Sequence, residues 1–247
     1  MGDVPKIDVG RVVQRSFEVL GRQIGPYLLL SLLLSGIPTG YMNWLTLQTV
    51  GGVTSFDVST PGAAAAWLLA LLGGFLLQAV IVRSSILQLS GNRPDLRGSL
   101  SSAFRLILPM IGLAICTGFL IVIGTLLLIV PGIIVYIALI VSVPVLVEES
   151  GLFHSMRRSR ELTKGSRWRI FLLLLLLVVA YLIAWGVTAA IGSALGITES
   201  ALLQSLLQAA STAMTTVLGS AVTAALYFEL RAVKEGVTFQ GLAEVFA

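Results

Sequence analysis

Long runs of apolar residues alternate with short polar segments along the whole of this 247-residue chain. A helix of about 20 apolar residues crosses the hydrocarbon core of a bilayer. The six longest runs therefore predict transmembrane helices, and the chain is expected to be an all-α integral membrane protein with a single polytopic domain over residues 1–247. The expected spans are residues 24–47, 63–82, 106–130, 133–147, 170–191 and 201–228.

The third and fourth spans are separated only by Pro131 and Gly132. A Pro-Gly pair favours a turn, because proline has no amide hydrogen to continue a helix, so we expect a tight hairpin at this pair. The fourth span is short and carries Pro144 near its end. It can fill space between tilted neighbours, thin the bilayer locally or continue as a kinked helix past Glu148.

The fifth and sixth spans differ in their side chains. The fifth contains six consecutive leucines at residues 172–177, which predicts a helix with extensive lipid contact. The sixth is rich in Ala, Ser, Thr and Gly between residues 209 and 223. Small side chains let helix backbones approach closely, so this helix is expected inside the bundle.

Each odd-numbered span is preceded by a segment with an amphipathic helical pattern, at residues 7–22, 96–105 and 151–164. Apolar residues lie on one face and basic residues on the other, which is typical of helices in the plane of the membrane interface. An Arg-Ser-x-Glu string occurs in the first and third segments, at residues 15–18 and 158–161. The order of interfacial helix, span, outer turn and span indicates three parallel repeats.

All 16 Lys and Arg residues lie in four groups, at residues 6–22, 83–105, 157–169 and 231–234. Basic loops remain in the cytoplasm during membrane insertion. The sequence therefore predicts a membrane protein whose two termini, including a tail at residues 229–247, are cytoplasmic. The three interfacial helices would then form a basic collar on the inner leaflet.

Composition narrows the class of protein further. Hydrophobic residues make up 56% of the chain and charged residues only 11%, whereas a soluble domain carries about 25% charged residues. A net charge of +4 could attract nucleic acid. Because the cations lie beside the spans, membrane topology and anionic lipid explain them, and no nucleic-acid partner is expected. Cys116 is the only cysteine, which excludes an intrachain disulfide.

Glu148, Glu149 and His154 are the nearest approach to a catalytic cluster. Two carboxylates and an imidazole can bind a divalent metal or transfer protons. The simpler interpretation is that the acids end the fourth span at the water interface and neutralise the arginines that follow. Common nucleophile, phosphate-loop and zinc-protease motifs are missing, and no charged residue lies at the centre of a predicted span. We therefore predict no enzyme activity, no catalytic residue, no metal and no cofactor.

The stretch from Arg157 to Arg169 concentrates six basic residues beside a tryptophan. Guanidinium groups form paired hydrogen bonds with phosphate, and an indole ring anchors at headgroup depth. This pattern predicts a phospholipid headgroup site, although retention of the loop in the cytoplasm also explains the basic residues. The predicted site residues are Arg157, Arg158, Arg160, Lys164, Arg167, Trp168 and Arg169.

Two parts of the second half of the chain, residues 131–171 and 226–236, resemble a known family. They are similar to a bacterial six-span family that includes the YciC-type proteins and the membrane domain attached to some glycerophosphoryl diester phosphodiesterases. The resemblance implies a six-helix domain of a bacterial inner membrane that is linked to phospholipid or envelope homeostasis, without the soluble phosphodiesterase domain. The family motif residues are Pro131, Gly132, Pro144, Glu148, Ser159, Gly165, Tyr227, Arg231, Glu235 and Gly236.

The expected function is that of a non-enzymatic, lipid-interacting or scaffolding membrane domain whose partners are anionic headgroups of the cytoplasmic leaflet. Assembly with a second copy or with another membrane protein is compatible with this expectation. The alternative is a transporter, channel or lipid flippase with an uncharged pathway beside the sixth span. A cavity lined by Gln204, Gln208 and Ser211 would favour the alternative.

Overall fold

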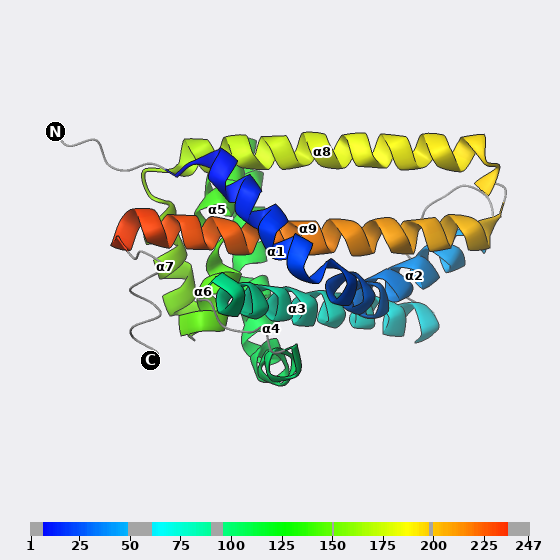
Figure 1. The fold of residues 1–247 in the computed structure, drawn as a ribbon, viewed down its shortest axis with the longest axis horizontal. Helices are drawn as coiled ribbons and strands as arrows, with labels where there is room; N and C mark the ends of the chain where they lie inside the picture. The colour runs from blue at the N-terminus through cyan, green and yellow to red at the C-terminus, as the bar shows by residue number, and fades with distance from the viewer. Residues whose placement is uncertain (1–6, 49–60, 90–95, 150, 198–199, 237–247) are drawn as a thin grey trace. The chain divides into compact units, whose positions relative to one another are not determined.

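The computed structural model describes residues 7–48, 61–89, 96–149, 151–197 and 200–236, and these residues form helices with no strand among them (Figure 1). Within these ranges, six helical segments are long and apolar enough to cross a membrane. The all-α prediction is thereby confirmed, and the chain is a multi-pass membrane protein. The six segments are Gln23–Leu47, Gly62–Ser85, Gly98–Leu127, Ile129–Glu149, Arg167–Ala194 and Ala201–Glu235.

The chain divides into two compact units. Unit 1 comprises Met1–Arg22, Gln78–Leu175 and Gly219–Ala247, and unit 2 comprises Gln23–Leu77 and Leu176–Leu218. Unit 1 contains the whole of α4 (Leu96–Leu127), α5 (Ile129–Leu139), α6 (Ser142–Glu149) and α7 (Leu152–Thr163). Unit 2 contains the π-helix η1 (Leu32–Gly36) and α2 (Ile37–Gln48). The helices with residues in both units are α1 (Val9–Ser31), α3 (Pro61–Leu89), α8 (Arg167–Ala194) and α9 (Ala201–Glu235).

A bend in α1 separates its amphipathic part from the first span. The bend lies at Gln23, whose backbone leaves the helical region (φ −143°, ψ 30°). Pro26 follows three residues later, and its ring crowds the carbonyl one turn before it, so the helix breaks in this turn. Before the bend, Val12, Val19 and Leu20 are buried. This face of the amphipathic part therefore packs on the protein itself.

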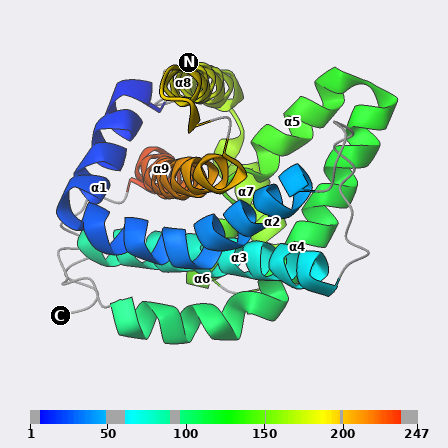
Figure 2. The same cartoon turned by 90° about the vertical axis from the view of Figure 1, so that its right-hand side faces the viewer.

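The hairpin between the third and fourth spans turns at Leu128 (Figure 2). Leu128 is extended (φ −166°, ψ 149°), and α5 begins at the next residue. The prediction that Pro131 and Gly132 form the turn is wrong, because both lie in the first turn of α5. A proline is tolerated there, since its missing amide hydrogen has no intrahelical partner to lose. A Cβ on Gly124 would lie 3.1 Å from the Cα of Gly132, so the two glycines let α4 and α5 approach closely.

Other helix boundaries also differ from the expected ones. Residues 96–105 are the first part of α4, so this segment is continuous with the third span. The fourth span is a kinked helix: α5 ends at Leu139, and α6 continues to Glu149. Pro144 explains the break at Ile140 and Val141, because it cannot donate a hydrogen bond to the carbonyl one turn earlier. Helix α9 runs to Glu235, so its end includes residues that were assigned to the tail.

Helices pack closely in unit 2 at the small residues of the sixth span. A Cβ on Gly36 would lie 2.8 Å from the carbonyl oxygen of Ala209, and one on Gly40 would lie 2.9 Å from that of Ser205. These two contacts are one turn apart on both helices, so the glycines of η1 and α2 allow a close approach to the small residues of α9. By contrast, only 11% of the apolar window of α8 is buried, as expected for a leucine-rich helix in contact with lipid.

Candidate functional site

The basic segment after the fourth span folds as the short helix α7, which begins and ends at glycine-dependent turns. Gly151 precedes α7 with φ +99°, and Gly165 follows it with φ +88°. Residues with a side chain rarely adopt this left-handed region, so both turns favour glycine. These turns set the orientation of α7 and of the first turn of α8, where the predicted headgroup residues lie.

One face of α7 is buried and holds the helix against α5. The Ser159 hydroxyl donates a hydrogen bond to the carbonyl of Ala138 at 2.8 Å, and Thr163 makes a longer contact with the same oxygen at 3.4 Å. Ala138 lies in the last turn of α5, where carbonyls have no donor within the helix. Ser159 therefore docks α7 and satisfies the end of α5. The opposite face of α7 remains exposed.

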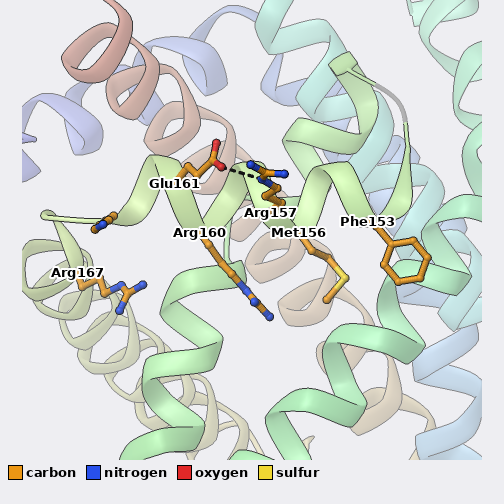
Figure 3. Close-up of a pocket in the computed structure, with 7 residues that line it drawn as sticks. Phe153, Met156, Arg157, Arg160, Glu161 and Arg167 are labelled. Carbon is orange, nitrogen blue, oxygen red and sulfur yellow. Dashed lines mark hydrogen bonds and ion pairs between the residues drawn. The ribbon is translucent and has the colours of Figure 1, made fainter.

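The exposed side of α7 and the start of α8 form an open pocket of about 570 Å³ (Figure 3). Arg157 and Glu161 form an ion pair at 3.1 Å, with side chains that are 83% and 53% exposed. In Figure 3, Arg160 and Met156 extend to the other side of the helix from this pair. We call this surface the basic pocket, and its lining residues are Phe153, Met156, Arg157, Arg160, Glu161, Lys164 and Arg167.

Three cations of the basic pocket have no acidic partner within the described ranges. These are Arg160, Lys164 and Arg167, and all three are exposed. Arg167 also starts α8, whose first turn contains no acidic residue. The N-terminus of a helix carries partial positive charge, so cations there are unfavourable and an anion is favourable. The pocket is thus suited to an anion with several acceptor oxygens.

The structure separates the remaining predicted headgroup residues from the pocket. Arg158 contacts Glu235 and lies 3.6 Å from a carboxylate oxygen of Glu149. Arg169 donates a hydrogen bond to the carbonyl of Ile7 at 2.5 Å. The exposed indole of Trp168 stacks on Phe171. Four of the six predicted cations therefore line the pocket, while Arg158 and Arg169 bind groups within unit 1.

A chain of polar contacts connects α6, α7 and α9 in unit 1. Glu148 accepts hydrogen bonds from the Tyr227 hydroxyl and from Arg231. Arg231 also binds Glu235 at 3.0 Å. Glu235 contacts Arg158, and Figure 1 shows α7 near the C-terminal end of α9. Residues from two distant parts of the sequence therefore meet in one network. We call it the α6–α7–α9 network, and its members are Glu148, Glu149, His154, Arg158, Tyr227, Arg231 and Glu235.

A second ionic contact of α9 was not expected from the sequence. Glu229 is fully buried, and it binds Arg15 at 2.7 Å and Arg11 at 3.2 Å. Its sequence signal is an acidic residue between apolar neighbours in Tyr227-Phe228-Glu229-Leu230. Arg15 and Arg158 begin the two Arg-Ser-x-Glu strings, and each binds a glutamate of α9. The threefold repeat itself stays a prediction.

Two of the three polar residues named for a transport pathway, Gln208 and Ser211, form hydrogen bonds along their own helix. Gln208 contacts the Thr212 hydroxyl at 3.4 Å, and Ser211 donates to the Gln208 carbonyl at 3.0 Å. The basic pocket is lined by other residues. Among the residues that the structure describes, no group of three or more His, Cys, Asp or Glu side chains is placed to hold a metal ion. Comparison of the chain with models of known protein families, with curated proteins and with solved structures found no match.

Proposed function

We propose that the chain is a lipid-interacting domain of a bacterial inner membrane, and that its basic pocket binds anionic phospholipid headgroups of the cytoplasmic leaflet without catalysing a reaction. The observation that carries this proposal is the convergence of Arg160, Lys164 and Arg167 on one open pocket without an acidic partner in the described ranges. Phosphate oxygens would neutralise these cations through charge-assisted hydrogen bonds.

Aromatic side chains near the pocket favour a lipid as the source of the phosphate. Phe153 lines the pocket and is 79% exposed, and Trp168 follows Arg167 and is 71% exposed. Exposed aromatic rings next to cations are typical of residues at headgroup depth, where the ring contacts the acyl boundary and the charge contacts phosphate. A soluble anion would leave these rings in water.

The contacts on the buried side of α7 support binding by holding the pocket in place. Ser159 anchors the helix to α5, and Arg158 joins it to α6 and α9. A site that is ordered before binding loses less entropy when the ligand arrives. The resemblance to a six-span family linked to phospholipid or envelope homeostasis points to the same class of function.

The pocket can be tested with two variants that remove equal charge. We expect Arg160→Gln/Arg167→Gln to weaken binding of phosphatidylglycerol about tenfold or more, because each lost charge-assisted hydrogen bond contributes about 1.5 kcal/mol or more. Arg105→Gln/Lys234→Gln removes two exposed cations outside the pocket and should weaken binding less than about threefold. Dissociation constants for the detergent-solubilised full chain measure the difference. Equal weakening by the two variants would refute a specific pocket.

The proposed orientation predicts that α8 crosses the membrane with its start in the cytoplasm. In a Cys116→Ser background, Lys164→Cys precedes α8 and Leu195→Cys follows it, and both native residues are exposed. We expect a membrane-impermeant maleimide to label Leu195→Cys on intact cells and Lys164→Cys only after permeabilisation, since cations resist translocation. Labelling in the reverse order would place the basic pocket on the outer leaflet and remove the cytoplasmic assignment.

A further inference from the structure

The charge balance of the basic pocket defines the kind of headgroup that fits it. Arg157 is already paired with Glu161, whereas Arg160, Lys164 and Arg167 lack an acidic partner among the described residues. A phosphodiester headgroup such as phosphatidylglycerol has one negative charge and leaves two of these cations uncompensated. A phosphomonoester has a charge of about −1.5 to −2 near neutral pH and three terminal acceptor oxygens. A phosphomonoester therefore neutralises more of the positive charge of the pocket than a phosphodiester does.

The three cations also line the same pocket. Arg160 lies in the last turn of α7, and Lys164 caps the end of this helix, with its amide donating a hydrogen bond to the Arg160 carbonyl at 3.2 Å. Arg167 comes from the first turn of α8, and Figure 3 shows it on the side of α7 toward which Arg160 extends. Arg167 is also the first residue of this 28-residue helix, whose first amide groups have no acceptor within the helix.

From this charge and geometry we propose that the basic pocket selects a phosphomonoester headgroup, as in a phosphatidic-acid-type lipid, over a phosphodiester headgroup. This inference rests on the proposed lipid-binding function and specifies the ligand class of the same site. The shared chemistry is a dianionic phosphate monoester, which a lipid or a small soluble phosphate can supply. The exposed rings of Phe153 and Trp168 favour the lipid.

A phosphomonoester makes the affinity depend on pH. Its second ionisation occurs near pH 6, whereas arginine and lysine remain protonated from pH 5 to pH 8. Raising the pH through this interval adds a negative charge to the ligand and should strengthen binding. The charged groups that face the ligand are Arg157, Arg160, Lys164 and Arg167, together with Glu161, which is paired with Arg157. Histidine also changes charge in this interval, but His154 binds Glu149 at 2.8 Å and does not line the pocket.

The test compares three probes on the full chain in detergent micelles: short-chain phosphatidic acid, short-chain phosphatidylglycerol and glycerol 3-phosphate. Calorimetric dissociation constants are measured near pH 5 and near pH 8. We expect phosphatidic acid to bind about tenfold more tightly than phosphatidylglycerol at the higher pH, equivalent to about 1.4 kcal/mol, and to lose most of this advantage at the lower pH. Arg160→Gln/Arg167→Gln should abolish the preference, and His154→Gln should keep both the preference and its pH dependence.

Each contrary outcome has a distinct meaning. Equal binding of the two lipids at both pH values, still weakened by Arg160→Gln/Arg167→Gln, overturns the phosphomonoester preference and leaves the lipid-binding function standing. Unchanged binding of both lipids in that variant overturns both proposals. Glycerol 3-phosphate binding as tightly as phosphatidic acid supports the phosphomonoester chemistry but overturns a lipid as its source. If His154→Gln loses the pH dependence, that dependence comes from His154 and not from the second ionisation of the phosphate.

Discussion

Replacing Arg231 with methionine is expected to lower the free energy of unfolding by on the order of 3 kcal/mol, because it removes the arginine that contacts Glu148 and one of the two arginines that contact Glu235. Arg231 contacts Glu148 and Glu235, and its side chain is only 19% exposed. The control is Arg157→Met, which removes a pair whose arginine is 83% exposed and should cost less than about 1 kcal/mol. Unfolding in mixed micelles of increasing SDS content, followed by circular dichroism, measures both variants.

A second substitution separates the unpaired charge from lost packing. Glu148→Gln in the Arg231→Met background removes the carboxylate charge that has lost its arginine, so the double variant should recover part of the lost free energy of unfolding. Equal losses in Arg231→Met and Arg157→Met would show that the α6–α7–α9 network is no more stabilising than a surface ion pair. A double variant less stable than Arg231→Met would show that Glu148 stabilises the protein through contacts other than the arginine.

Two adjacent glycines of α3 should respond oppositely to the same substitution. A Cβ at Gly73 would collide with the backbone carbonyl of Leu34 in η1, whereas a Cβ at Gly74 would meet nothing within 4 Å. A backbone carbonyl cannot move aside as a flexible side chain can. Gly73→Ala is therefore expected to lower the free energy of unfolding by about 2 kcal/mol. Gly74→Ala should be neutral or stabilising by up to about 1 kcal/mol, because alanine favours a helix interior.

The origin of this close approach lies in the sequence of the first span. Pro38 has no amide hydrogen to donate to the carbonyl of Leu34, one turn before it, and η1 is the local widening that accommodates the proline. Glycine at position 73 lets α3 approach that carbonyl. The same unfolding measurement tests the geometry within unit 2: if Gly73→Ala is as stable as Gly74→Ala, α3 and η1 are not in this contact.

The α4–α5 hairpin shows where sequence patterns lose resolution. Its existence follows from two apolar runs with almost no polar residue between them. The turn lies at Leu128 because Gly124 and Gly132 allow the two helices to pack closely, and this packing decides which residues continue the helix. Proline is accommodated in the first turn of a helix as well as in a loop, so Pro131 by itself does not mark the turn. Local propensity therefore favoured the wrong position for the turn.

The sequence located the basic segment, whereas the tertiary structure decided which of its cations line the pocket and which bind other groups of the protein. The density of arginines between residues 157 and 169 marks a basic surface in any fold. Arg157 and Arg158 are neighbours in the chain, yet one lines the pocket and the other binds Glu149 and Glu235. Adjacent residues of a helix point about 100° apart, and only the position of α9 decides which of them meets a carboxylate.

The sequence alone determined the helical class and the six membrane segments, because crossing a bilayer depends on the length and hydropathy of each local run. It also located the basic segment. Only the tertiary structure decided which charges are engaged and which are available. Glu229 was assigned to a polar tail and is instead buried against Arg11 and Arg15. Such pairings join residues far apart in the chain, and the free energy that selects them comes from packing between helices rather than from any local pattern.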